Sequence, residues 1–197
     1  MIIAFGDRVK RSYDNYNYLS RKIAYASMGY MEIALAQKSA LRIKGKTATF
    51  VVNPQVSVAA NAVLLFTPGA EFSSEEAVVL NGAGEYEIGG VKITGSRNEK
   101  SVLYSMQIDG MDIVVGSIAL LSALQHKLKE YNIVVVDCDE IADASFLTSL
   151  AVNAVVFYGD RAEEVAQNFE KEKLQKMNKY SASLGKLPAE METILLQ

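Results

Sequence analysis

The polar residues best suited to chemistry in this sequence follow two apolar runs in its C-terminal half. Asp137, Cys138 and Asp139 come directly after IVVV, and Asp160 comes directly after AVVFYG. The carboxyl ends of neighbouring parallel strands meet at one edge of a sheet, where α/β proteins bind ligands. Carboxylates gathered there could hold Mg²⁺ or Ca²⁺, which prefer oxygen ligands. The commoner role of such acids is to cap the following helices, and we favour that interpretation.

Cysteine and histidine, the residues most used as zinc ligands, occur once each. Cys138 would need a nearby base to act as a nucleophile. His126 is predicted on a helix about 200° away from Leu124, on the solvent side, so it cannot be that base. We therefore expect Cys138 to be a small, part-buried apolar residue. A catalytic zinc ion takes three protein ligands, so these two residues could complete a site only with carboxylates.

Composition limits the class of protein. Half of the 197 residues are hydrophobic, the net charge is −3, and a single cysteine excludes an internal disulfide. These features are typical of a globular protein of a reducing compartment, and we expect it to be cytoplasmic. No apolar run approaches the roughly 20 residues that span a bilayer, and no long run of one charge favours nucleic acid, so neither a membrane nor a nucleic acid is expected as a partner.

Residues 1–30 differ from the rest of the chain. They hold five of the ten tyrosines and carry five basic against two acidic residues, whereas the remainder carries 15 basic against 21 acidic residues. This asymmetry predicts an N-terminal extension over 1–30, outside the working domain, and a domain over 31–197.

The first part of that domain has the pattern of β-strands. Alternating or apolar runs occur at 31–37, 39–45, 47–53, 61–67, 75–82, 85–93 and 101–116. Gly45 is expected to supply a positive φ in the turn between the second and third runs. Gly89-Gly90 and Asp109-Gly110 predict two-residue hairpin turns.

After Gly116 strands and helices alternate. Helices are predicted over 119–132, 139–153 and 160–173, the last with Asp160 as N-cap, and a mixed-charge helix end over 170–179. Buried strands are predicted at 133–138 and 154–159, and a closing strand at the C-terminus. Hairpins followed by this alternation predict an α/β sandwich: two mixed sheets face to face, with helices outside.

Several motifs resemble one known family. LLFT followed by a loop, GEYEIGGVKITG at 84–95, MDIVVGS at 111–117 and the C-terminal KMNKYSASLGKLPAEMETILLQ resemble the metallo-β-lactamase fold. The nearest branch is the small bacterial hydrolases similar to ascorbate-6-phosphate lactonase. The resemblance covers roughly 31–197. It implies a four-layer αββα sandwich with a zinc site at one edge.

The resemblance also implies where zinc ligands would lie, and this chain departs from the family there. The family motif Thr-His-x-His-x-Asp-His begins at Thr67, and its four ligands fall on Pro68, Ala70, Phe72 and Ser73. The bridging aspartate falls on Ser117, a further histidine within SRNEKS, and the last one on Tyr158 or Gly159. We therefore expect no zinc and no other cofactor.

Two functions remain open. The first is a non-catalytic protein that binds a protein partner or itself and presents Phe72 at a contact surface. The second is a lactonase or phosphoester hydrolase with a rebuilt carboxylate metal site, for which Asp137, Cys138, Asp139 and Asp160 are the candidates. We favour the first and expect no enzymatic activity.

Overall fold

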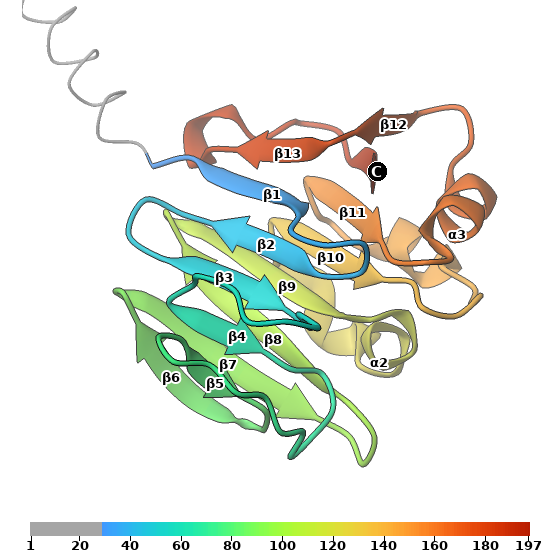
Figure 1. Cartoon of the computed structure of the whole chain (residues 1–197). Helices are drawn as coiled ribbons and strands as arrows, with labels where there is room; N and C mark the ends of the chain where they lie inside the picture. Colours follow the sequence, from blue (N-terminus) through green and yellow to red (C-terminus); the bar gives the residue numbers. More distant parts are fainter. Residues whose placement is uncertain (1–28) are drawn as a thin grey trace, which may run out of the picture.

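The computed structural model of the protein describes residues 29–197. The predicted extension over 1–30 lies outside the described residues except for its last two positions. Within the described part, two β-sheets pack face to face (Figure 1). A single apolar core fills the space between them, with Phe50, Ile113 and Val135 among its fully buried members.

The first sheet has six strands in the order β13-β1-β2-β3-β4-β5. It comprises β1 Met31–Leu35, β2 Leu41–Lys44, β3 Thr49–Val52, β4 Ala62–Leu64, β5 Val78–Leu80 and β13 Lys179–Ala182. The strands from β13 to β3 pair antiparallel, whereas β3, β4 and β5 are parallel to one another.

The second sheet has eight strands in the order β12-β14-β11-β10-β9-β8-β7-β6. It comprises β6 Gly84–Ile88, β7 Val91–Arg97, β8 Val102–Ile108, β9 Met111–Ser117, β10 Ile133–Asp137, β11 Ala154–Tyr158, β12 Leu174–Met177 and β14 Glu192–Leu196. The strands β6, β7, β8 and β9 pair antiparallel. Across the rest of the sheet, in the order β9, β10, β11, β14 and β12, neighbouring strands are parallel. Both sheets are therefore mixed, and the predicted α/β sandwich of two mixed sheets is confirmed.

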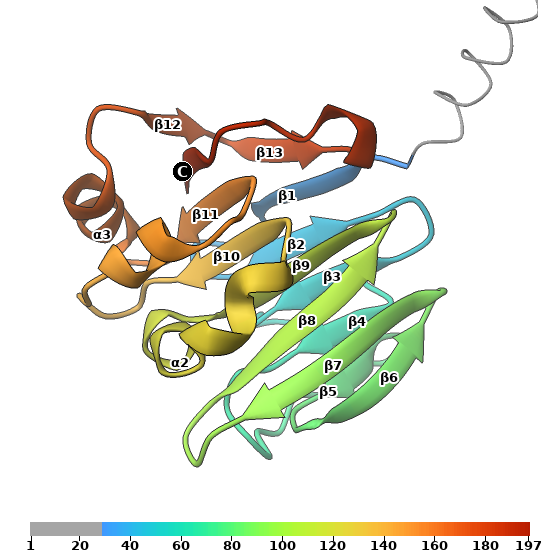
Figure 2. The same cartoon turned by 180° about the vertical axis from the view of Figure 1, so that it is seen from behind.

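A second apolar core lies beneath the helices. It joins the outer face of the eight-stranded sheet to α2 Ile118–Ala123, α3 Ala162–Phe169 and the 3-10 segments η1 Gln125–Glu130 and η2 Ser145–Ser149. Figure 2 shows this helical face toward the viewer. A further 3-10 turn, η3 Leu184–Lys186, precedes β14. No helix within residues 29–197 is long and apolar enough to cross a membrane.

The hairpin turns follow the sequence signals, with one correction. Asp109 and Gly110 have φ of 51° and 81°, and Gly89 and Gly90 have 60° and 78°, as the predicted two-residue turns require. Gly45 was expected to have a positive φ and does not. It is required for another reason: a Cβ there would lie 2.6 Å from the buried side chain of Ile108.

Three of the helix predictions were wrong in part. The helix predicted over 119–132 is α2 followed by the 3-10 segment η1, although Leu121 and Leu128 are both buried as their spacing indicated. Only Ser145–Ser149 of the second predicted helix is helical. The charged stretch 170–179 contains β12 at the sheet edge, where charged side chains remain in water, so its polarity was misread as a helix surface.

Candidate functional site

Three residues at the carboxyl ends of adjacent parallel strands form one row. Asp137 at the end of β10 pairs in register with Ser117 of β9 on one side and Tyr158 of β11 on the other. Residues in register across a parallel sheet project to the same face. For this row it is the inner face, since Tyr158 belongs to the core between the sheets. The row therefore faces the end of the six-stranded sheet.

Asn53 meets this row from the other sheet. It follows β3 with φ of 46°, a left-handed conformation that asparagine tolerates better than most residues. Its Oδ1 accepts a 2.9 Å hydrogen bond from the backbone N–H of Phe66, just after β4. Its Nδ2 donates a long, 3.5 Å hydrogen bond to Oδ2 of Asp137. One side chain thus connects the ends of β3, β4 and β10.

Asp137 is buried in spite of its carboxyl group. Only 4% of the residue is exposed, and its Oδ1 has no hydrogen-bond partner among the described residues. Burial raises the pKa of this carboxyl to about 8, and the negative charge of Asp139 adds to the rise. The Tyr158 hydroxyl is fully buried nearby, and burial together with the charge of Asp137 raises its pKa well above the usual value. At neutral pH Asp137 therefore keeps its proton.

Cys138 points away from this row. Its side chain is fully buried in the core beneath the helices, and its Sγ lies 3.7 Å from the carbonyl oxygen of Val136. Burial raises the pKa of the thiol, so it is not a thiolate at neutral pH. The predicted apolar role is confirmed, with complete rather than partial burial.

The two remaining acids are exposed, and only one of them adjoins the row. Asp139 follows Asp137 by two residues, and its negative charge contributes to the raised pKa of Asp137. Asp160 instead forms an exposed ion pair with Lys38, with 3.5 Å between Oδ1 and Nζ. The four candidate residues are therefore not gathered around one point.

The expected capping roles were wrong. The N-cap of α3 is Arg161, without a side-chain hydrogen bond, because the helix starts two residues after Asp160. After β10 no helical segment begins until Ser145. There Asp143, not Asp137 or Asp139, accepts hydrogen bonds from the backbone N–H and the hydroxyl of Ser145.

The loop after β4 holds the other positions of interest. Pro68, Ala70, Phe72 and Ser73 lie between Leu64 and Val78, and Phe72 is half-buried. The carbonyl oxygen of Ala70 accepts a hydrogen bond from Asn81 Nδ2, which holds the loop against the end of β5. Ser117 caps α2, and its Oγ accepts a 3.4 Å hydrogen bond from the N–H of Leu120.

Among the side chains that the structure describes, those of residues 29–197 apart from Lys129 and Glu130, no group of three or more His, Cys, Asp and Glu is suited to a metal ion. His126 is exposed on η1, as predicted. Asn53 was not predicted as a member of the site. Its position directly after the strand FVV was a signal for a left-handed residue, but nothing local identified its partner 84 positions away.

Comparison with known proteins identifies the fold. No family model and no curated protein matches the sequence. Among solved structures, a protein of Thermotoga maritima assigned as a Zn-dependent hydrolase of the metallo-β-lactamase superfamily aligns with a TM-score of 0.61 and 16% identity, over 84% of this chain and 98% of that chain.

Two further solved structures agree. One assigned as a metal-dependent hydrolase of Parabacteroides distasonis gives a TM-score of 0.52 at 12% identity, over 85% of this chain and 94% of that chain. A metallo-hydrolase of Ignicoccus hospitalis gives 0.50 at 10% identity, over 78% and 98%. At such low identities the likeness establishes the fold alone: the chain has the metallo-β-lactamase fold.

Proposed function

We propose that this chain is a non-catalytic protein of the metallo-β-lactamase fold that acts as a binding or assembly module. The observation that carries the proposal is the row of Ser117, Asp137 and Tyr158, of which the last two are buried. It lies at the edge where the family resemblance implies a zinc site. Ser117 Oγ accepts from Leu120 and Asp137 Oδ2 from Asn53, whereas Asp137 Oδ1 and the Tyr158 hydroxyl are buried without a partner among the described residues. Asn53 closes it from the opposite sheet.

The side chains at this edge do not suit zinc. Zinc binds thiolate, neutral imidazole and carboxylate groups. Cys138 faces the other core as a thiol, His126 lies on a distant exposed segment, and Asp160 pairs with Lys38. Asp137 and Asp139 are left, and the first holds a proton at neutral pH. The resemblance puts the family's histidines at Pro68, Ala70, Ser73, a position within SRNEKS, and Tyr158 or Gly159, none of which is a histidine in this chain.

A hydrogen-bonded connection takes the structural place of a metal in this proposal. A metal ion bound by loops of both sheets would hold those loops together. Here Asn53 joins β3 and β4 of one sheet to β10 of the other through Phe66 and Asp137. This edge of the sandwich can then be stable without a cofactor. A structural role accounts for Asn53 and Asp137 without any catalysed reaction.

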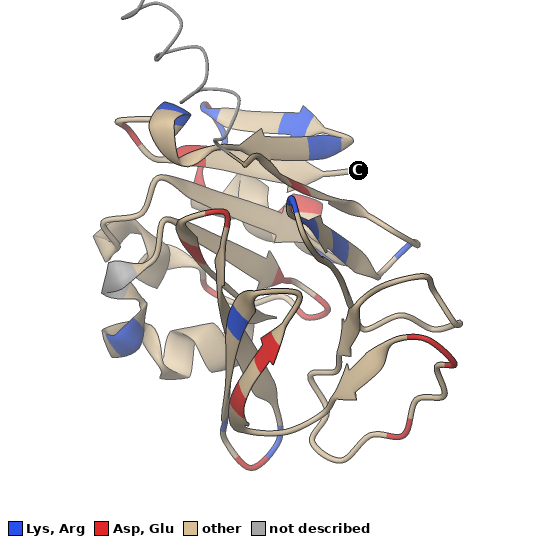
Figure 3. Ribbon diagram, turned by 90° about the vertical axis from the view of Figure 1, so that its left-hand side faces the viewer, with Lys and Arg blue, Asp and Glu red and all other residues tan. Residues whose placement is uncertain are grey.

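The partner on this proposal is a protein or a second copy of the chain. Phe72 is half-buried in the loop between β4 and β5, with polar residues at 71 and 73–76 on either side, as suits a contact residue. Figure 3 shows basic and acidic residues on the same side of the molecule, and the net charge is −3, which gives no support to nucleic acid as a partner. We place the protein in the cytoplasm, because its single cysteine is a free, buried thiol, as suits a reducing compartment.

Metal analysis of the full-length, untagged protein tests the proposal. We expect well below one zinc, iron, manganese, magnesium or calcium per chain, both as purified and after incubation with zinc followed by dialysis. An Asp139→Asn variant is the control, since a carboxylate site would lose metal with this change. Roughly one metal per wild-type chain that disappears in the variant would refute the non-catalytic assignment.

Mass in solution tests the assembly part. Light scattering on wild type and on Phe72→Ser should show an assembly, or a co-purifying partner, that the variant loses. A strict monomer without any partner would count against an assembly module.

A hydrolase of the lactonase or phosphoester type is the second candidate. It is favoured by one observation: Asp137 and Asp139 lie two residues apart at the carboxyl end of β10, and the charge of Asp139 contributes to the raised pKa of Asp137. Such a pair could hold Mg²⁺ if the proton left Asp137. On this alternative Asp139→Ala should abolish metal-dependent hydrolysis, and any hydrolysis that survives the change would remove the main support for the site.

A further inference from the structure

A groove lies on the outer face of the eight-stranded sheet, away from the row of Ser117, Asp137 and Tyr158. It has a volume of about 350 Å³, the size of a small-molecule site. Asp112 at the start of β9 and Tyr131 just before β10 line it. Because Ser117 and Asp137 stand at the opposite ends of these two strands, the groove is a separate place on the molecule.

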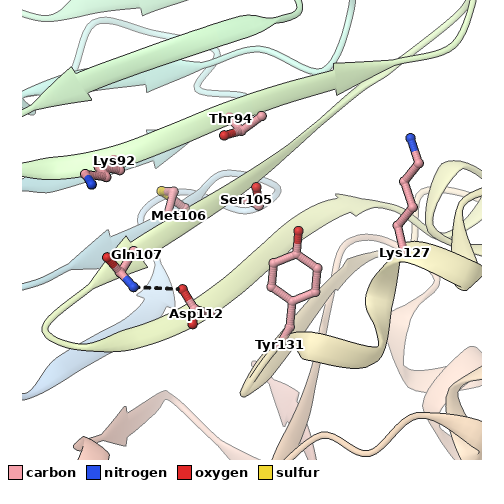
Figure 4. A pocket seen from close by; sticks show the side chains of 8 residues that line it. All are labelled: Lys92, Thr94, Ser105, Met106, Gln107, Asp112, Lys127 and Tyr131. Carbon is pink, nitrogen blue, oxygen red and sulfur yellow. Dashed lines mark hydrogen bonds between the residues drawn. The ribbon is translucent and has the colours of Figure 1, made fainter.

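Strand register explains why the surface is hollow there. Lys92, Gln107 and Asp112 are register partners across β7, β8 and β9 and form one row of long polar side chains. In the next row Thr94 pairs with Ser105, and these small residues leave space above the sheet. Lys127 and Tyr131 form the far wall, where the helical layer ends. Figure 4 shows Lys92 and Lys127 on opposite sides, with the three hydroxyl groups between them.

Asn132 fixes the position of Tyr131, in the far wall of the groove, relative to Asp112, in the row of long polar side chains. Its backbone N–H donates to the carbonyl oxygen of Asp112 at 2.7 Å, and its Oδ1 accepts from the N–H of Asp112 at 2.9 Å. Its Nδ2 donates to Asn153 Oδ1 at 3.2 Å. Tyr131, the adjacent residue, therefore stands at a fixed position beside Asp112, so little ordering is needed for a ligand to bind.

The lining has the chemistry of a sugar site with a cationic rim. Gln107 Nε2 donates to Asp112 Oδ1 at 3.3 Å, so this amide and carboxylate present a connected acceptor and donor surface. A carboxylate accepts hydroxyl protons, and the apolar face of a tyrosine ring packs against the C–H face of a sugar. Lys92 and Lys127 form no ion pair among the described side chains, which do not include those of Lys129 and Glu130. Two such ammonium groups suit an anion.

The geometry points to this groove as a binding site for a sugar that carries one anionic group, such as a sugar phosphate. Asp112 disfavours a bare anion, which has no hydroxyl protons to offer it, and the lysines disfavour a neutral sugar relative to a charged one. The site goes beyond the proposed function and does not depend on it, because none of its residues belongs to the edge around Asp137.

Titration of the ¹⁵N-labelled full chain with glucose 6-phosphate tests the site, with EDTA present to exclude metal effects. We expect shifts of the amides of Thr94, Ser105, Asp112 and Tyr131, with a dissociation constant on the order of 0.1–1 mM. Glucose and inorganic phosphate, titrated separately, should each bind at least about tenfold more weakly.

Substitutions in the groove test whether glucose 6-phosphate binds there. Lys92→Ala and Lys127→Ala should each weaken glucose 6-phosphate binding by about 5- to 20-fold, since each removes one charge-assisted contact. Ser105→Leu should fill the hollow and abolish binding. Lys100→Ala removes an exposed charge from the loop after β7 and should change nothing.

Three results would overturn the site. The first is the absence of any amide shift at 10 mM glucose 6-phosphate, on the order of ten times the weakest expected dissociation constant. The second is a set of shifts confined to another surface, and the third is inorganic phosphate binding as tightly as glucose 6-phosphate. The last would show a simple anion patch. None of them bears on metal content, so failure here is distinguishable from failure of the non-catalytic assignment.

Discussion

Asp137 is one of two polar side chains that the described core buries almost completely, the other being Thr193. A buried carboxylate without a full set of partners is costly, so the group avoids the cost by keeping its proton. Its Oδ2 accepts from Asn53, and its Oδ1 has no partner among the described residues. The proton therefore keeps an unbalanced charge out of this buried edge at neutral pH.

Replacing this carboxyl by an amide should make the protein more stable in alkaline solution. The pKa of Asp137 is about 8 in the folded protein and near 4 when unfolded. The folded state therefore binds this proton more strongly, and the free energy of unfolding falls as pH rises from about 4 to about 8. Asp137→Asn cannot ionise, and we expect it to be about 1–3 kcal/mol more stable than wild type at pH 8.5.

Urea unfolding of both proteins at pH 5 and pH 8.5 measures the difference. The gain should be small at pH 5, where the wild-type carboxyl is protonated in the folded state. A gain that is equal at both pH values would show that the carboxyl does not titrate in this window. Asp137→Ala is the matched control, since it removes the partner of Asn53 and should destabilise at both pH values.

The role of this residue could not be predicted from neighbouring sequence. A carboxylate after a buried strand most often caps the next helix, and that rule selected the wrong role for Asp137. Its partner lies 84 positions earlier in the chain. The exposure of His126 was predictable from its helical position, and the apolar role of Cys138 from the lack of a nearby base, although its burial is complete rather than partial.

At the scale of elements, the hairpin tips of both sheets meet at one end of the sandwich. The turn between β2 and β3 lies against the turn between β8 and β9: the N–H of Lys46 donates to Asp109 Oδ2 at 2.9 Å. Thr47 Oγ1 donates to the carbonyl oxygen of Gly89 at 2.7 Å, in the turn between β6 and β7. Three turns therefore form one contact region.

A methyl group at Gly45 should disrupt this region. The new Cβ would lie 2.6 Å from Cδ1 and Cγ1 of the buried Ile108, so this side chain would have to shift within the core. We expect Gly45→Ala to lower the free energy of unfolding by about 1–3 kcal/mol, the range for overpacking. Gly82→Ala is the control: nothing lies within 4 Å of its new Cβ, so it should be neutral or slightly stabilising. Similar unfolding curves for both variants would contradict the steric argument.

Most elements of the sheets were predictable, because strand alternation and turn residues are local signals. The strands at 31–35, 41–44 and 49–52 and both two-residue turns follow from them. The strand β12 and the 3-10 segment η1 do not. Leu174 and Met177 are only half-buried at an edge, and Leu128 reaches the core through 3-10 rather than α geometry, both of which depend on tertiary packing.

At the scale of the whole molecule, Tyr104 connects the two sheets on the side of the sandwich that carries β5 and β6. It lies on β8, and its buried hydroxyl is 3.0 Å from the carbonyl oxygen of Leu65, just after β4, and 2.9 Å from that of Leu80, the last residue of β5. Burial raises the pKa of this phenol, so it remains a donor at any ordinary pH.

Removing this hydroxyl should weaken the sandwich with little change of packing. Tyr104→Phe leaves the carbonyl oxygen of Leu65 without this donor in a dry interface, and we expect a loss of about 1–2 kcal/mol in the free energy of unfolding. Tyr86→Phe, whose hydroxyl has only long 3.4 Å contacts, is the control and should lose less. Equal losses of unfolding free energy in the two variants would show that the buried hydrogen bond of Tyr104 stabilises the protein no more than the long contacts of Tyr86.

Two chain crossings give the molecule a further property. At one side the chain leaves β12 at Met177 and enters β13 at Lys179, and at the other it passes from β5 to β6 within residues 81–83. Each crossing runs from the outermost strand of one sheet to the outermost strand of the other. The chain therefore connects the edge strands of the two sheets along both sides of the sandwich. Neither sheet can separate from the other by unfolding from its own edge. Opening should be cooperative, so that amide protons of both sheets exchange with solvent in the same rare event.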